Sequence, residues 1–331
     1  MNYMERTLDA KAINRQADSI KVQEQEVVEP PKKAGMFDRL ERTEIIFKVI
    51  SYVLLTLFAL ACVYPLIYVL SVALSDAEAY GKGIVLLPHV GNHIGITAFD
   101  EKNSAFVKVF TNNDFWFAYC NTVFYAFYGT LVSMVVGITG AYALSKSRLM
   151  FGRGFNFLLT FTMWFSAGIV ATWQNFVRLG INNKYGFIFG LGFNAFNIIL
   201  LRNGFKGVPT EIEEAATIDG ATEFQLLTKI YIPMSKSSIA TVTMFYALSR
   251  WNGYYWASIL LGSETDKPLQ VYMRDKLVVN DETRPWYSAF DYSQDTYMFA
   301  LVICSIIPII IVYPLMQKYF AAGVNLGGVK E

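Results

Sequence analysis

Long apolar runs constrain the fold of this chain more than any other feature of its sequence. A transmembrane helix needs about 20 consecutive apolar residues to cross the hydrocarbon core of a bilayer. The loops between the runs are polar, and only 17% of the 331 residues are charged, against about 25% in soluble domains. We therefore expect an all-α polytopic membrane protein. Its six predicted spans lie at about residues 45–74, 115–143, 155–173, 185–201, 238–261 and 296–316.

The charged flanks of these runs indicate which side of the membrane each loop faces. Loops rich in Lys and Arg remain in the cytosol. Basic residues precede the first run and recur in the loop at 146–153. Six spans then place both termini and the loop at 209–233 in the cytosol. We expect a flexible cytosolic tail over 1–43, a transmembrane domain over 44–316 and a cytosolic tail over 317–331.

The polar stretch from Pro209 to Pro233 predicts two short helices with a sharp corner. Thr210 suits a helix N-cap, with Glu213 at the spacing of a capping box. Gly220 suits the left-handed end of that helix. Thr222 and Gln225 then predict a second capping box, and Pro233 predicts a break before the next span.

The predicted fifth span is interrupted in its middle by a charged and aromatic segment. A charge within hydrocarbon is costly, so we expect Arg250 to face a water-filled pathway or a polar partner. Aromatic rings stack on sugar rings, and Arg and Asn bond hydroxyl groups. The predicted pathway residues are Arg250, Trp251, Asn252, Tyr254 and Tyr255. Alternatively, the aromatic residues form an interfacial belt or only pack helices together.

The stretch at 209–233 resembles the EAA loop of the membrane subunits of ABC importers. Glu214-Ala215-Ala216, three residues, Gly220, nine residues and then Ile230 to Pro233 match that motif. Ile232 stands where the family usually has Leu. The segment 214–221 is similar to the sugar-importer branch in particular. The chain end, with Gly327, Gly328 and Lys330, is similar to maltose-type permeases, and the long first loop is similar to polysaccharide-type members.

This resemblance implies the type I ABC importer permease fold and a set of partners. An ATPase subunit would dock on the loop, and the tail residues Gly327, Gly328 and Lys330 would also contact it. The resemblance assigns the ATPase coupling to Glu213, Glu214, Ala215, Ala216, Asp219, Gly220 and Pro233. It further implies a second homologous permease, two ATP-binding subunits, an extracytoplasmic solute-binding protein and an oligosaccharide substrate, in a bacterial inner membrane. Family members often carry histidine near position 250, so Arg250 would favour an acidic sugar.

The sequence contains no signature for energy conversion or catalysis of its own. No phosphate-binding GxxxxGK[ST] loop is present, and the apolar runs lack the acidic residues of a proton relay. We therefore expect no cofactor in this chain, with ATP and Mg bound by the partner ATPase. We also expect no metal site, because the three cysteines lie in apolar runs and both histidines lie in one loop. The net charge of +1 gives no indication of nucleic-acid binding. The alternatives are an importer permease for a non-sugar solute, a secondary carrier or, more remotely, a membrane-embedded enzyme.

Overall fold

The fold is described from a computed structural model that covers residues 42–81, 83, 86–99, 104–278 and 293–324. Nearly all of the expected N-terminal tail therefore lies outside the described residues. The same holds for Gly327, Gly328 and Lys330, so their expected contacts with an ATPase stay predictions. The chain divides between Tyr64 and Pro65 into two units, and each is described by itself.

The first unit contributes the beginning of helix α2 (Arg42–Ala73), whose remainder belongs to the second unit. No charged residue follows Lys48 within this helix. Its portion Glu44–Ala73 has the length and the apolar composition of a membrane span. The first predicted span is therefore confirmed as a helix.

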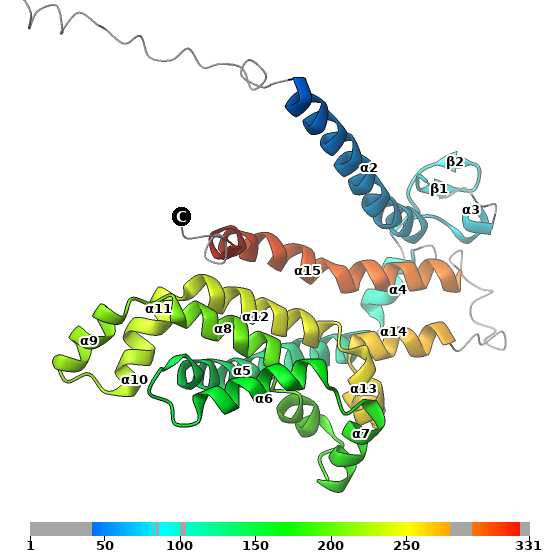
Figure 1. The fold of residues 1–331 in the computed structure, drawn as a ribbon. Helices are drawn as coiled ribbons and strands as arrows, with labels where there is room; N and C mark the ends of the chain where they lie inside the picture. Colours follow the sequence, from blue (N-terminus) through cyan, green and yellow to red (C-terminus); the bar gives the residue numbers. More distant parts are fainter. Residues whose placement is uncertain (1–41, 82, 84–85, 100–103, 279–292, 325–331) are drawn as a thin grey trace, which may run out of the picture. The chain divides into compact units, whose positions relative to one another are not determined.

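The second unit is almost entirely helical where it is described (Figure 1). Its strands, β1 and β2, form one short antiparallel pair in which His89 lies opposite Ile94. After α2 the elements are α3 (Ala77–Gly81), β1 (His89–Val90), β2 (His93–Ile94), α4 (Ala105–Thr111), α5 (Asn113–Ser145), α6 (Gly152–Trp164), α7 (Ile169–Arg178), the π-helix η1 (Gly186–Gly190), α8 (Ala195–Lys206), α9 (Thr210–Ile218), α10 (Glu223–Gln225), the π-helix η2 (Leu226–Tyr231), α11 (Ile232–Met234), α12 (Lys236–Trp251), α13 (Tyr254–Leu260), the 3₁₀ turn η3 (Glu264–Asp266), α14 (Leu269–Val278) and α15 (Gln294–Val324).

Among the described residues, α2, α5 and α15 are the helices long and apolar enough to cross a membrane unbroken. The span predicted over 155–173 is a bent pair of helices, because α6 ends at Trp164 and α7 leaves at a bend of 116°. The span predicted over 185–201 is divided into two separate pieces, η1 and α8, neither of which is long enough to cross a membrane by itself. The break predicted within 238–261 is confirmed and lies between α12 and α13.

Helix α5 forms the centre of the second unit, because both α8 and α12 pack along it (Figure 1). A cluster of buried apolar side chains joins these three helices to η2. Its members include Leu201 and Phe205 from α8, Val242 from α12 and Leu226 from η2. A second cluster joins α4, α5, α14 and α15. The elements α9 and α10 therefore extend from the end of a packed group of helices (Figure 1).

Candidate functional site

The loop at 209–233 forms the predicted pair of helices with a corner between them. Helix α9 ends at Ile218, and Gly220 follows with a φ of +81°. That is the left-handed conformation predicted for this glycine, which other residues adopt only with strain. The second capping box is confirmed: the Thr222 hydroxyl accepts from the Gln225 amide, and the Gln225 side chain accepts from the Thr222 amide.

Two details of the loop differ from the prediction. Pro209 is the N-cap of α9, and Thr210 is already helical and makes no side-chain cap bond. The predicted capping box with Glu213 is therefore wrong, because the Glu213 carboxylate accepts from Lys146 and Tyr231 instead. Pro233 lies inside α11, so the break predicted there is displaced to Ser235, whose backbone is not helical.

The outer surface of α9 and α10 combines acidic and large apolar side chains. Glu214, Asp219 and the small Ala215 are exposed. Ile218 and Phe224 are 86% and 73% exposed, which is unusual for such large apolar side chains outside a lipid-facing span. Sequence analysis missed both, although each stands next to a polar residue in an otherwise hydrophilic loop. Exposed apolar groups bordered by charges are typical of a protein-binding surface.

Two of the residues assigned to ATPase coupling face inward rather than outward. Ala216 is half-buried and packs against the cluster of α5, α8 and α12. Burial by itself raises the pKa of Glu213, but hydrogen bonds from Lys146 and Tyr231 and the charges of Lys146 and Arg148 outweigh it. The pKa of Glu213 therefore lies below its ordinary value, and the residue carries its negative charge at neutral pH.

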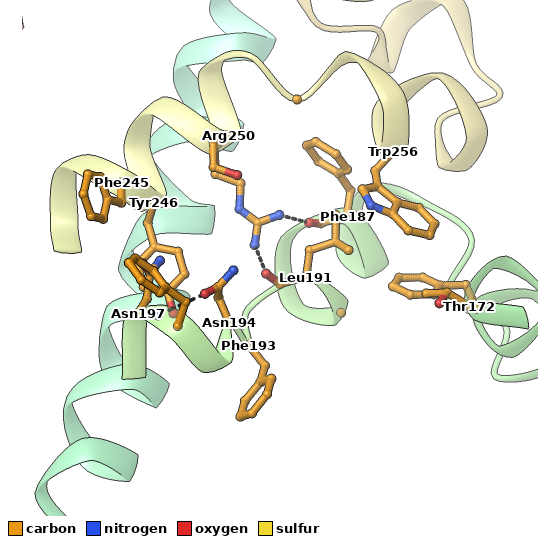
Figure 2. Close-up of a pocket in the computed structure, with 15 residues that line it drawn as sticks. Thr172, Phe187, Leu191, Phe193, Asn194, Asn197, Phe245, Tyr246, Arg250 and Trp256 are labelled. Atoms are coloured by element: carbon orange, nitrogen blue, oxygen red, sulfur yellow. Dashed lines mark hydrogen bonds between the residues drawn. The ribbon is translucent and has the colours of Figure 1, made fainter. Parts of the chain in front are cut away.

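A second candidate site is a pocket of about 710 Å³ beside the break between α12 and α13 (Figure 2). Residues of α7, η1, the start of α8, α12 and α13 line it. They are Thr172, Phe176, Phe187, Gly190, Leu191, Phe193, Asn194, Phe196, Asn197, Phe245, Tyr246, Ser249, Arg250, Gly253 and Trp256. Aromatic rings with a few amide and hydroxyl groups are the usual lining of a small-molecule site.

Arg250 lies at the wall of this pocket and bonds to the backbone of η1. Its Nη1 atom donates to the Phe187 carbonyl at 2.8 Å, and Nη2 donates to the Leu191 carbonyl at 2.5 Å (Figure 2). The residue is only 7% exposed. We expected Arg250 to face either a water-filled pathway or a polar partner. The structure shows polar partners for its guanidinium group, and these are backbone carbonyls. Within the described part of the chain no carboxylate forms an ion pair with Arg250.

Of the five predicted pathway residues, only Arg250 lines the pocket. The Trp251 indole nitrogen donates to the Ser305 carbonyl of α15, so this side chain packs helices together. Asn252 is exposed and caps α12 through its backbone amide. The Tyr254 hydroxyl accepts a hydrogen bond from Arg274, and Tyr255 is exposed and does not line the pocket. This pocket therefore does not bring these four residues together with Arg250, contrary to the prediction from the sequence.

Sequence analysis did not select the amide and aromatic residues that do line the pocket. Asn194 caps α8 by accepting from the Asn197 amide, and Asn197 itself is buried. Phe193 precedes them, and Tyr246 and Phe245 face them from α12 (Figure 2). The available signal was the pair of asparagines within an apolar run, where an amide needs a buried partner or water.

The sequence of this chain is similar to those of known transport proteins. Residues 34–326 match the family described as binding-protein-dependent transport system inner membrane component. The polygalacturonan/rhamnogalacturonan transport system permease protein YtcP of Bacillus subtilis is 33% identical over 291 residues, which cover 86% of this chain and 98% of YtcP. The protein LplC of the same organism is 32% identical over 68% of this chain and 78% of its own length.

A solved structure of a transporter has a similar fold. It is a crystal structure of a bacterial ABC transporter involved in the import of the acidic polysaccharide alginate. One of its chains is 42% identical to this chain with a TM-score of 0.77, covering 85% of this chain and 99% of that one. The similarity therefore extends over nearly the whole length of that transporter chain.

The close approach of Arg250 to α5 gives a prediction about stability. A Cβ atom added at Gly129 would lie 2.9 Å from Arg250 Nε and would displace the guanidinium group. We expect Gly129→Ala to destabilise the protein by about 1–3 kcal/mol, as overpacking of a core does. Gly140→Ala on the same helix is the matched control, because nothing lies within 4 Å of its added Cβ. Thermal unfolding in detergent, followed by tryptophan fluorescence, measures both; equal midpoints would contradict this account of Arg250.

Proposed function

Because this chain belongs to the family of binding-protein-dependent transport system inner membrane components, we propose that it is a permease subunit of an ATP-driven sugar importer. The observation that carries this proposal is its near full-length similarity to a chain of the alginate importer. Similarity to a permease for polygalacturonan and rhamnogalacturonan supports the same substrate class. The chain would form half of the translocation pathway and catalyse no reaction itself.

The exposed face of α9 and α10 supports a docking role for an ATPase. Glu214 and Asp219 would provide polar contacts, Ala215 would allow close approach, and Ile218 and Phe224 would enter apolar hollows of the partner. Gly220 sets the corner between the two helices. ATP and Mg would bind on the ATPase. Closure of the two ATPase subunits would move this loop as a rigid body and with it α8 and α12, which adjoin it in sequence.

The remaining partners follow from the same assignment. A second permease would complete the pathway, and a solute-binding protein would dock on the loops at 76–114 and 263–294. The loop at 209–233, both termini and the tail residues Gly327, Gly328 and Lys330 would face the cytosol of a bacterium. Membrane lipid or the second permease would cover exposed apolar side chains of the spans, such as Phe117 and Phe157.

The pocket beside Arg250 supports a path for sugars, with acidic sugars favoured. Phe193 and Phe196 provide exposed rings on which a sugar can stack, and Asn194 provides an exposed amide. Backbone carbonyls solvate the guanidinium group of Arg250 but do not cancel its charge. Because this positive charge has no described carboxylate partner, it would attract an anion in a medium of low dielectric constant.

Energy coupling can be tested with the complex of this chain and its native partners in proteoliposomes. We expect uptake of labelled oligogalacturonide to require ATP and to be lost in Gly220→Asp, because a charged side chain would occupy the docking corner. Gly180→Asp is the matched control, since Gly180 also has a positive φ and open space around it but lies outside the loop. Uptake that persists without ATP would instead indicate a secondary carrier.

The substrate class can be tested by competition in the same vesicles. Unlabelled oligogalacturonide should inhibit uptake at concentrations about tenfold or more below those of a malto-oligosaccharide of equal length. The physical reason is the attraction between uronate groups and the positive wall of the pocket. Raising the salt concentration should reduce this preference. Equal inhibition by the two sugars would contradict a preference for acidic substrates and leave a general oligosaccharide importer.

A further inference from the structure

A compact polar cluster joins the loop to the end of α5. Lys146, the C-cap residue of α5, donates from Nζ to Glu213 Oε1 at 2.6 Å and to the Tyr231 hydroxyl at 2.9 Å. The Tyr231 hydroxyl in turn donates to Glu213 Oε2. The Lys146 ammonium also lies 4.0 Å from the centre of the Tyr231 ring. These three residues, here called the clamp, come from α5, α9 and η2 and bond one another in a closed triangle.

The clamp attaches α9 to α5 and η2 through charged and hydroxyl groups. No side chain of α9 is fully buried, and Ala216 is only half-buried where it meets the apolar cluster. In contrast, η2 is anchored by the buried side chains of Leu226, Leu227 and Tyr231. Helix α9 therefore has little apolar contact of its own. Its orientation depends on the Glu213 carboxylate.

The side chains of the clamp are more buried than those of a neighbouring ion pair. The side chains of Lys146 and Glu213 are 9% and 18% exposed, whereas those of Arg148 and Glu223 are each 57% exposed. Exposed ion pairs are screened by water and contribute little. Removing one partner of a sheltered pair leaves the other charge without compensation, which is far more costly. Arg148 Nη2 also lies 3.9 Å from Glu213 Oε1, beyond hydrogen-bond distance, so its exposed charge gives the clamp only a screened attraction and no bond. Arg148 is therefore the exposed counterpart against which loss of the clamp bonds can be compared.

The clamp connects α9 to the central helix of the second unit. The backbone joins the loop to α8 at one end and to α12 at the other, and both of these pack on α5. Without the clamp, a load on α9 would pass through these two backbone connections and the limited apolar contact of Ala216. With it, α9 is also bonded directly to the end of α5, so the three helices receive the same displacement.

We propose that Lys146, Glu213 and Tyr231 are positioning residues that transmit the movement of α9 to α5 during transport. This inference rests on the proposed function, in which an ATPase docks on α9. Glu213 then acts on the side of α9 that faces α5 and η2, while its exposed neighbour Glu214 belongs to the docking face. Breaking the clamp separates ATP hydrolysis from sugar movement without removing the docking surface.

The decisive measurement is the number of sugar molecules imported per ATP hydrolysed, in proteoliposomes containing the whole complex. Oligogalacturonide serves as the transported probe. We expect Lys146→Met, which keeps the length of the side chain but removes its charge, to lower this ratio at least about tenfold. Tyr231→Phe removes one hydroxyl and should lower it about fivefold. The control Arg148→Gln should remain within about twofold of the wild type.

The outcomes separate coupling from folding and from the proposed function. Retained ATP hydrolysis together with a lower ratio in both clamp variants supports the proposal, since a folding defect would reduce both activities in step. An unchanged ratio in Tyr231→Phe overturns it, even if Lys146→Met does not assemble. Proportional loss of hydrolysis and uptake, or an equal effect of Arg148→Gln, also overturns it. A wild-type complex without ATP-dependent uptake refutes the proposed importer, and the clamp's role in coupling with it.

Discussion

Backbone groups released by helix breaks must find partners, and this constraint shapes the centre of the structure. In hydrocarbon an unpaired carbonyl costs several kcal/mol, so irregular backbone is tolerated only where protein or water satisfies it. Arg250 meets the requirement for η1 by donating to the carbonyls of Phe187 and Leu191. The absence of a side chain at Gly129 leaves room for the guanidinium group to reach them. The pocket lies where helix breaks adjoin, beside the bonds from Arg250 to the carbonyls of η1.

The sequence predicted the parts of the fold that depend on local chemistry and continuous composition. The unbroken apolar runs became α2, α5 and α15, and the Thr222 capping box formed because both partners lie within one turn. The all-α fold and membership of the ABC importer permeases were also predicted correctly. The break within 185–201 was not, because a helix end inside an apolar run depends on tertiary partners such as Arg250, which is distant in the sequence. Glu213 was assigned to a local cap for the same reason: its partners, Lys146 and Tyr231, are 67 and 18 residues away. The break within 155–173 has a local signal that was missed, because Gly168 adopts a positive φ at the start of α7.

Neighbours in the sequence proved a poor guide to the composition of the pocket. Residues 250–255 cross a helix break, and successive side chains of a helix point about 100° apart. Arg250 therefore faces η1 while Trp251 faces α15. The site combines pieces that the chain brings together from α7, η1, α8 and α12. Selecting Asn194 and Asn197 required knowledge of which helices adjoin, whereas a charge in an apolar run was visible from the sequence alone.

The exposed side chains of Ile218 and Phe224 affect how long an unassembled copy of this chain persists in the cell. A copy that has not yet met its partner presents two large apolar groups to water, on a short helical projection. Such surfaces are recognised by chaperones and proteases and promote aggregation. Assembly would hide them. The surplus of this chain over its partners would then be removed by quality control, so the stoichiometry of the complex would be enforced by degradation as well as by the rate of synthesis.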